Sequence, residues 1–201
     1  MRQKKVKHIH RQFFENAGVV TKVKPVLLDS KRVFLEIGSG KGKFITDMAK
    51  DHPHDLFVAM EININVCYRI LQKKEAMNLD NLIIILGDAT NLLDYISDSQ
   101  IDGIFLNFSD PWPKKKHHKR RLTSPIFLEK YLVILKHDGF IQFRTDHADF
   151  FYDSIEYMTP HMHIKKINNH VDPSDYMTEY EMKKRVTGTI YQLDAEVKKD
   201  A

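Results

Sequence analysis

The sequence predicts an α/β fold in which helices cover both faces of a mostly parallel, twisted sheet. Short β-branched apolar runs alternate with longer amphipathic segments along a chain of 201 residues. The runs are apolar on both faces, which is typical of parallel strands buried between two layers of helices. The length fits a single domain of this doubly wound type.

Five apolar runs are the expected parallel strands: residues 33–37, 56–62, 82–86, 104–108 and 140–145. The amphipathic segments between them are the expected helices: residues 43–50, 64–78, 91–96 and 124–136. A helix at 149–158, a strand at 163–168 and the closing strand TIYQLDAEV follow. A parallel connection needs a crossover of about a dozen residues or more, so the short connection before the last strand predicts that it enters antiparallel.

Positive charge is concentrated in two segments. The formal net charge is +4 and the isoelectric point about 9.0, but basic residues gather in residues 1–11 and 114–121. We therefore expect a basic N-terminal arm over residues 1–31 and a globular domain over residues 32–201. This uneven distribution favours an anionic partner, and nucleic acid in particular.

Cys67 is the only cysteine, which excludes an internal disulfide and fits a reducing, cytoplasmic setting. The N-terminus lacks the apolar segment of a secretory signal, and no apolar stretch approaches the ~20 residues of a membrane span. The histidines His8, His10, His161, His163 and His170 have no ligand-like spacing with acids or the cysteine. We therefore expect no metal site and no membrane contact.

A glycine-rich loop, FLEIGSGKGKF, follows the first expected strand. Gly38, Gly40 and Gly42 permit positive φ and a close approach of ligand to backbone, where doubly wound sheets bind nucleotides. The third glycine comes one residue early for the dehydrogenase pattern G-x-G-x-x-G, and Ile37 and Phe44 break the Walker pattern. The alternative is a tight turn that binds nothing.

Acidic residues stand at the ends of three successive expected strands. Glu36 precedes the glycines, where a carboxylate would repel a pyrophosphate but attract the ammonium or sulfonium of S-adenosylmethionine. Glu61 has the spacing of an acid that accepts hydrogen bonds from ribose hydroxyls, and Asp88 is placed to hold an adenine amino group. Each acid alone is better explained as a solvated loop residue. Together with the glycine loop they predict an adenosine pocket.

The fourth strand runs into the segment NFSDPWPKKKHHKRRLT. Its prolines hold the backbone extended, so Asp110 and Trp112 are presented rigidly at the edge that carries the other acids. Trp112 fits a core position as well as it fits stacking on a nucleobase. The basic block at 114–121 fits a solvated loop, but its place beside the acids favours contact with a nucleic-acid backbone.

These motifs resemble those of the bacterial tRNA (guanine-N7)-methyltransferases, the TrmB family. The segment FLNFSDPWPKKKHHKRRLT is similar to the family hallmark nearly residue for residue, and LEIGSGKGKF, FRTD, TEYE and IYQLDAE match in the same order. The resemblance implies a Rossmann-like class I methyltransferase that uses S-adenosyl-L-methionine. It further implies methylation of guanine N7 in the tRNA variable loop. We expect a cytoplasmic monomer or homodimer with no obligate protein partner.

The resemblance also implies roles for individual positions. The expected cofactor contacts are Glu36, Gly38, Gly40, Glu61, Asp88, Ala89 and Asp110, and Asp110 is also the expected catalytic residue. The expected substrate contacts are Lys114, Asp146, Thr178, Glu179, Tyr180 and Glu181. The expected RNA contacts are Lys116, His117, His118, Lys119, Arg120 and Arg121. The chain departs from the family at Arg144 and His147, where Lys and Asn are more common, and in abbreviated segments before the first strand and before TEYE.

Alternatives remain for the role of the TEYE motif and for the function of the protein. TEYE also matches the capping box S/T-x-x-E, which explains Thr178 and Glu181 without any substrate. An Asp-Pro-aromatic element can hold an exocyclic amine, so methylation of a base amino group is a second possible reaction. A non-catalytic RNA-binding module is a third possibility, distinguished by its failure to bind the cofactor.

Overall fold

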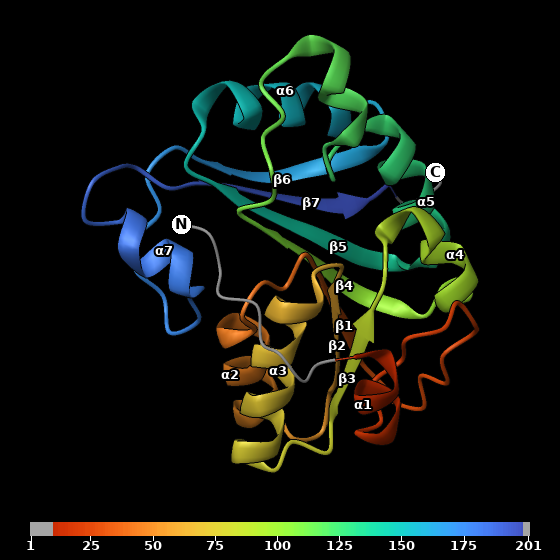
Figure 1. Ribbon diagram of the computed structural model, residues 1–201. Coiled ribbons are helices and arrows are strands. Elements are labelled where there is room, and N and C mark those ends of the chain that lie inside the picture. Colours follow the sequence, from red (N-terminus) through yellow and green to blue (C-terminus); the bar gives the residue numbers. More distant parts are fainter. Residues whose placement is uncertain (1–9, 199–201) are drawn as a thin grey trace.

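The computed structural model describes residues 10–198 and contains a seven-stranded sheet in the order β3-β2-β1-β4-β5-β7-β6 (Figure 1). The strands are β1 (Val33–Ile37), β2 (Leu56–Glu61), β3 (Leu82–Leu86), β4 (Ile101–Asn107), β5 (Leu135–Thr145), β6 (Met162–Asn168) and β7 (Tyr191–Val197). Strands β1 to β5 pair in parallel, whereas β7 pairs antiparallel with both β5 and β6. The predicted fold class and the antiparallel last strand are confirmed.

Helices cover both faces of this sheet. They are α1 (Arg11–Asn16), α2 (Lys43–Asp51), α3 (Ile64–Met77), α4 (Leu92–Tyr95), α5 (Pro125–Ile134), α6 (Ala148–Met158) and α7 (Glu179–Lys184). Helices α2 and α3 lie side by side against one face, where Phe44 and Ile70 join one apolar cluster (Figure 1). Helices α4, α5 and α6 contribute to a second cluster that includes Leu128 and Phe150. The strand order reverses between β1 and β4, and such switch points are where open α/β sheets bind ligands.

Two strands begin three or more residues earlier than predicted. Strand β5 begins at Leu135 and not at residue 140, so α5 ends at Ile134. Strand β4 begins at Ile101, and the register shifts between Ile101 and Gly103. The early part of β5 contains the exposed residues His137 and Asp138, so it lacks the continuous apolar pattern that marks a buried strand.

The described part of the expected N-terminal arm packs onto the domain. Residues 1–9 lie outside the described residues. Phe14 is fully buried, and Val20 exchanges two backbone hydrogen bonds of 2.9 Å with the edge strand β3, to Ile84 and from Leu86. Covering an edge strand in this way satisfies its backbone groups. Residues 10–31 therefore add to the core, while the domain boundary near residue 31 stays a prediction.

Candidate active site

A cavity of about 750 Å³ opens at the C-terminal edge of the sheet, where the first four strands end. Its lining includes expected cofactor residues from four separate segments: Gly38, Glu61, Asp88, Ala89 and Asp110. A hollow of about 260 Å³ adjoins it beyond Gly38 and Phe108. That hollow is lined by Gly40, Asn107, Thr178, Glu179 and Tyr180, among others. The fold thus brings expected cofactor and substrate residues to one edge.

The glycine loop is held in a conformation that favours glycine. Gly38, Gly40 and Gly42 have φ values of 74°, 56° and 81°. A side chain at Gly42 would also come within 3.0 Å of Ile70. The loop is tied to β2, because the Gly40 N–H donates to Oε2 of Glu61 at 2.9 Å. Apart from the two chain neighbours of Gly40, no atom of the described residues lies within 4 Å of a Cβ built at Gly40, so a ligand can approach the backbone there, as predicted.

Glu36 is a fully buried carboxylate at the end of β1. Its Oε1 accepts a 2.8 Å hydrogen bond from Nδ2 of Asn107, but within residues 10–198 its Oε2 and the Oδ1 of Asn107 have no partner. Burial raises the pKa of Glu36 to about 8, although the hydrogen bond from Asn107 opposes the shift. A buried carboxylate with an unpaired oxygen lowers the stability of the fold, because the oxygen has lost its hydrogen bonds to water. The arrangement fits a ligand that brings a cationic donor.

Glu61 and Asp88 combine structural bonds with a place on the cavity wall. Glu61 accepts from the N–H groups of Gly40 and Asn63 at 2.9 and 2.8 Å, and burial raises its pKa. Asp88 accepts from the Thr90 N–H at 2.8 Å and caps the 3₁₀ turn Ala89–Asn91. Each carboxylate oxygen can accept a second hydrogen bond, so both acids remain able to bind hydroxyl or amino groups.

The loop after β4 has an unusual backbone. Phe108 and Trp112 adopt φ values of 53° and 41°, a region that large side chains seldom occupy and that is enriched at functional sites. Asp110 is exposed and lines the cavity mouth. Trp112 is half-buried: it stacks on His117 with ring centroids 5.7 Å apart, and the Arg120 guanidinium lies 5.0 Å from its ring centroid. Trp112 therefore lines the site and is not a core residue.

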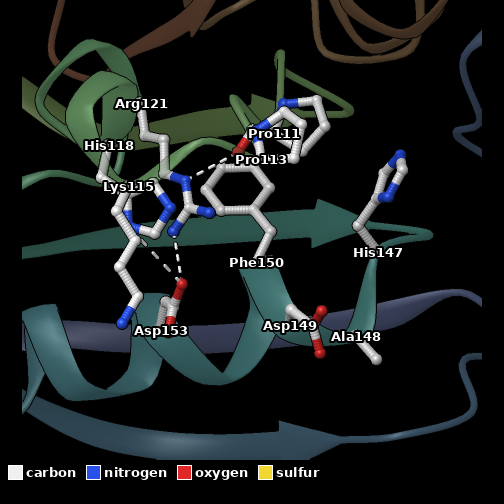
Figure 2. A pocket seen from close by; sticks show the side chains of 10 residues that line it. All are labelled: Pro111, Pro113, Lys115, His118, Arg121, His147, Ala148, Asp149, Phe150 and Asp153. Atoms are coloured by element: carbon white, nitrogen blue, oxygen red, sulfur yellow. Dashed lines mark hydrogen bonds and ion pairs between the residues drawn. The ribbon is translucent and has the colours of Figure 1, made fainter.

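The basic block divides into exposed and buried side chains. Lys114, Lys116, Lys119 and Arg120 are exposed, and His117 and His118 are half-buried. Arg121 is only 2% exposed and points into the protein (Figure 2).

The inward position of Arg121 corrects its expected role as an RNA contact. Its Nε donates to the Pro111 carbonyl at 2.7 Å, and its Nη1 pairs with Asp153 at 2.6 Å. Its guanidinium also lies 4.9 Å from the ring centroid of Phe150. These contacts, drawn in Figure 2, fasten the proline-rich loop to α6. Arg121 therefore has a structural role.

Replacing Arg121 with alanine should therefore reduce stability before it affects RNA binding. The change leaves Asp153 and the Pro111 carbonyl without their donor, and we expect a loss of roughly 2–3 kcal/mol in the free energy of unfolding. Chemical denaturation measures this loss. The control is Arg120→Ala in the exposed neighbour, whose free energy of unfolding should change by less than about 1 kcal/mol. Equal effects of the two changes would contradict the buried role.

Asp146 meets the expected substrate residues of TEYE around α7. Oδ2 of Asp146 accepts from the Tyr180 hydroxyl at 3.1 Å and from Nζ of Lys184 at 2.9 Å. Burial acts to raise the pKa of Asp146, but the hydrogen bond from Lys184, a backbone hydrogen bond and the nearby charges of His147 and Lys184 together outweigh it, and the pKa lies below its usual value. Glu179 pairs with Lys73, whose ammonium also donates to the Lys41 carbonyl in the glycine loop at 2.7 Å.

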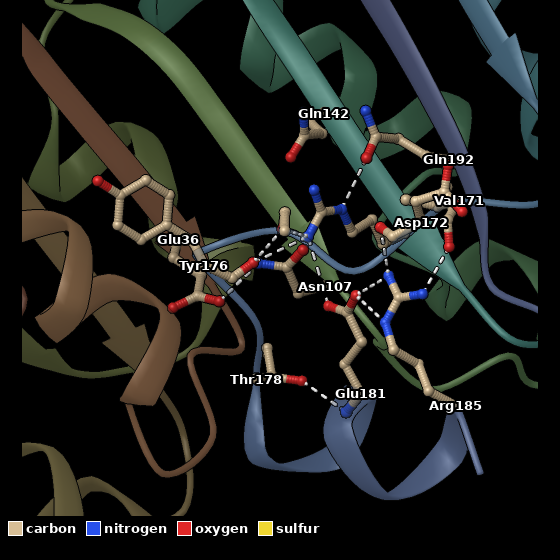
Figure 3. A network of polar contacts seen from close by, with 12 residues as sticks. Glu36, Asn107, Gln142, Val171, Asp172, Tyr176, Thr178, Glu181, Arg185 and Gln192 are labelled. Carbon is tan, nitrogen blue, oxygen red and sulfur yellow. Dashed lines mark hydrogen bonds and ion pairs between the residues drawn. The ribbon is translucent and has the colours of Figure 1, made fainter.

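The capping box is half formed. The Thr178 hydroxyl accepts from the Glu181 N–H at 3.0 Å, which makes Thr178 the N-cap of α7. The Glu181 carboxylate instead pairs with Arg144 and Arg185, and Figure 3 shows it directed toward Arg185. The capping alternative for Thr178 is therefore confirmed. Thr178, Glu179 and Tyr180 also line the hollow beside Gly40, and their contact with substrate stays a prediction.

Three polar residues of this site were not singled out from the sequence. Asn107 stands where an apolar strand meets the sheet edge, and a polar residue at that position is a signal that sequence reasoning could have used. Lys73 lies in a helix of ordinary amphipathic pattern, and Lys184 lies in a surface-like charged stretch. Nothing in the sequence pattern connects either lysine with the acid that it binds.

Three further findings concern membrane spans, metal-binding groups and the cysteine among the described residues. No helix among them is both long and apolar enough to cross a bilayer, and they contain no group of three histidine, cysteine or acidic side chains arranged to hold a metal ion. Cys67 is buried, and its burial raises the pKa of the thiol to about 12. A neutral buried thiol is a poor nucleophile, so Cys67 packs in the core without a chemical role.

Known proteins resemble this chain in sequence and fold. A family model described as "Putative methyltransferase" matches residues 30–193. A protein of Lacticaseibacillus casei named tRNA (guanine-N(7)-)-methyltransferase is 44% identical, with 84% of this chain and 82% of that protein covered. One of the same name from Staphylococcus haemolyticus is also 44% identical, with 83% and 81% covered.

Solved structures share the fold at low sequence identity. A SAM-dependent methyltransferase from Aquifex aeolicus aligns with a TM-score of 0.61 at 11% identity, covering 94% of this chain and 89% of that one. The 16S rRNA methyltransferase KamB aligns with a TM-score of 0.62 at 15% identity, covering 96% of each chain. At these identities the solved structures support only the fold, whereas the sequence relatives at 44% identity show the family. This chain belongs to the tRNA (guanine-N7)-methyltransferase family.

Proposed function

We propose that this protein transfers a methyl group from S-adenosyl-L-methionine to N7 of a guanine in tRNA, forming 7-methylguanosine. The observation that carries the proposal is a cavity at the sheet edge that the glycine loop, three acids and the basic block line together. The buried Glu36 carboxylate, with one oxygen unpaired, lies two residues before the first glycine of this loop. The 44% identity to proteins named for this reaction supports the choice of substrate. The variable loop as target and a cytoplasmic location are part of the proposal and come from the family resemblance.

The residues of the cavity suit the chemical groups of this cofactor. Glu61, in the cavity wall, offers acceptors to ribose hydroxyls. Asn107 lines the adjoining hollow, and with the fully buried Glu36, which is not part of the cavity lining, it offers two unpaired oxygens to an α-ammonium group. Asp88 and Ala89 line the part of the cavity that suits the adenine. When bound, S-adenosylmethionine supplies an electrophilic methyl group on a positively charged sulfur.

Methylation at N7 requires the protein to position the guanine but not to deprotonate it. Guanine N7 carries a free lone pair at neutral pH, so no strong base is required. The main task of the chain is to hold the purine in line with the methyl group. Such positioning can lower the activation free energy by up to about 7–11 kcal/mol. Positive charge moves into the purine as it reacts, and a nearby carboxylate stabilises that charge. Asp110 is the exposed carboxylate at the cavity mouth, whereas Asp146 is already bonded to Tyr180 and Lys184.

The exposed part of the basic block is proposed to hold the tRNA backbone. Lys116, Lys119 and Arg120 are exposed, and Lys119 and Arg120 also line the cavity. Each phosphate contact releases counterions, which makes affinity fall as salt rises. Lys114 is exposed and lies two residues after Trp112, which lines the cavity, so it is proposed to contact the nucleotide nearest the reacting guanine.

The triple change Lys116→Ala, Lys119→Ala and Arg120→Ala should weaken tRNA binding. If all three residues contact phosphates, the slope of log affinity against log salt concentration should become shallower by about 3. Filter binding across a salt series measures the slope, and circular dichroism serves as the control because these exposed changes should leave the protein folded. Equal slopes for mutant and parent would count against the block as an RNA contact.

Nucleoside mass spectrometry tests the reaction itself. Unmodified tRNA is incubated with the protein and methyl-labelled cofactor, and the labelled nucleoside is identified. The proposal predicts 7-methylguanosine. Label in N2-methylguanosine or N6-methyladenosine would favour the exocyclic-amine reaction. RNA binding without label, and without a rise in melting temperature on addition of S-adenosylhomocysteine, would favour the non-catalytic RNA-binding module.

A further inference from the structure

A second cavity lies between the loop after β4 and the start of α6 (Figure 2). Its volume is about 390 Å³, and none of the described residues that line it also lines the larger cavity of the candidate active site. Figure 2 shows two prolines on one side of it, the first residues of α6 on the other and an imidazole at one end: Pro111, Pro113, Ala148, Asp149 and His147. This cavity is a candidate for a second binding site.

The fold places the second cavity beside the proposed site of the target guanine. Strands β4 and β5 are parallel neighbours, so the segments that leave them start side by side at one sheet edge. One segment carries Asp110 followed by Pro111, and the other carries Asp146 followed by His147. Asp110 is the proposed catalytic carboxylate and Asp146 is an expected substrate contact. The nucleotide next to the target guanine is therefore within reach of the second cavity.

The charges around the second cavity are balanced. The Arg121 guanidinium pairs with Asp153 at 2.6 Å, and apart from two histidines the other charged groups of the lining are Lys115 and Asp149, of opposite sign. Within residues 10–198 neither Lys115 nor Asp149 has a side-chain hydrogen-bond or ion-pair partner. A phosphate would be attracted by the lysine and repelled by the aspartate. The cavity therefore suits an uncharged ligand that both donates and accepts hydrogen bonds.

The second cavity also offers flat ring surfaces. Its lining includes the rings of two prolines and the imidazole of His147, whose side chain is 52% exposed. Nε2 of His147 lies 4.0 Å from the Asp146 carboxylate, beyond hydrogen-bonding distance, so the ring is free to stack on a ligand. Unpaired RNA bases stack on such rings and present hydrogen-bonding groups along their edges. A nucleobase thus matches both the shape and the charge balance of the cavity.

We propose that the second cavity binds the base of the nucleotide adjacent to the methylated guanine, stacked on His147 with its polar edge toward Asp149 and Lys115. This inference rests on the proposed function and deepens it, because it adds a second nucleotide to the substrate that the site recognises. A guanine that leaves its stack to enter an active site deprives its neighbour of a stacking partner. The cavity replaces that partner, and the bound neighbour helps to hold the guanine in place.

Synthetic tRNAs that lack one base test this inference. The guanine that the protein methylates is located by mass spectrometry, and two tRNAs are made with an abasic nucleotide on its 5′ or its 3′ side. The value of kcat/KM for methylation is compared between these tRNAs and the intact tRNA. With the unmutated protein, one of the two abasic tRNAs should show a value about 5–100-fold lower, the range expected when one stacked base is lost.

The variant His147→Ala shows whether the base and the imidazole contact each other. With intact tRNA its kcat/KM should fall by a factor similar to that of the abasic tRNA. With the abasic tRNA it should fall by no more than about twofold further, because both changes remove the same contact. If His147→Ala does not fold by circular dichroism, Asp149→Ala replaces it, and its loss should likewise shrink with the abasic tRNA.

Two further variants separate stacking from other effects of the imidazole. His147→Phe keeps a flat ring without a charge, so its kcat/KM with intact tRNA should stay within about threefold of that of the unmutated protein. If the imidazole acted only through the charge of Asp146, His147→Phe would instead be as slow as His147→Ala. His137→Ala, an exposed histidine of β5, is the matched control and should leave all values unchanged.

Three outcomes would overturn the inference. In the first, the losses from His147→Ala and from the abasic tRNA multiply, which would place the effect of the missing base elsewhere, for example in the fold of the tRNA. In the second, both abasic tRNAs react as fast as intact tRNA. In the third, His147→Phe is as slow as His147→Ala. Failure of the proposed function looks different, because the unmutated protein would then form no 7-methylguanosine even with intact tRNA.

Discussion

Replacing Glu36 with glutamine should weaken the binding of S-adenosylmethionine by about 10–100-fold, since a charge-assisted hydrogen bond to a buried group contributes about 1.5–3 kcal/mol. Glutamine keeps the size of the side chain and an oxygen that can accept from Asn107, so the change isolates the negative charge. Isothermal titration measures the dissociation constant. The matched control is Glu129→Gln in the exposed face of α5, where the affinity should not change.

The same carboxylate predicts how cofactor binding depends on pH. Burial raises the pKa of Glu36 to about 8, so the ligand-free site holds a proton at neutral pH. A cationic ligand binds the ionised form, and this proton must leave when the ligand binds. The affinity should therefore fall by about tenfold for each pH unit below about 8, and Glu36→Gln should lose that dependence between pH 6 and 7.5. A flat profile in the unmutated protein would show that Glu36 is not linked to binding.

Replacing Asp110 with asparagine should lower the single-turnover rate of methyl transfer by about 100–1,000-fold, the range seen when one electrostatic contact to a transition state is removed. The side chain is exposed at the cavity mouth, so the fold should tolerate the change. Asp94→Asn, an exposed acid of α4, is the matched control and should retain the full rate. Undiminished formation of 7-methylguanosine by Asp110→Asn would remove Asp110 from its catalytic role.

The parts of the fold that burial dictates were predictable from the sequence. Strands β1, β2 and β3 are apolar on both faces, and their ends place Glu36, Glu61 and Asp88 at one edge without any knowledge of the structure. The start of β5 was not predictable, because its exposed residues give no continuous apolar run. The packing of residues 10–31 on β3 was not predictable either. It depends on a few buried residues such as Phe14, which form no periodic apolar pattern in the sequence.

The roles of charged residues were less predictable than their positions. Arg120 and Arg121 are neighbours in one basic run, yet one is exposed and the other is buried against Asp153. A run of like charges carries no periodicity that distinguishes the two. Glu181 was assigned by its motif, but its partner Arg144 lies 37 residues away in the chain, and only the fold brings them together.

A crystal structure with bound S-adenosylhomocysteine tests the central claim most directly, because this product keeps the amino group and the adenosine of the methyl donor. We predict its amino group within hydrogen-bonding distance of Oε2 of Glu36, its ribose beside Glu61, and the exposed lysines of the basic block around the same opening. Product bound at another surface, with Glu36 still lacking a partner, would contradict the account.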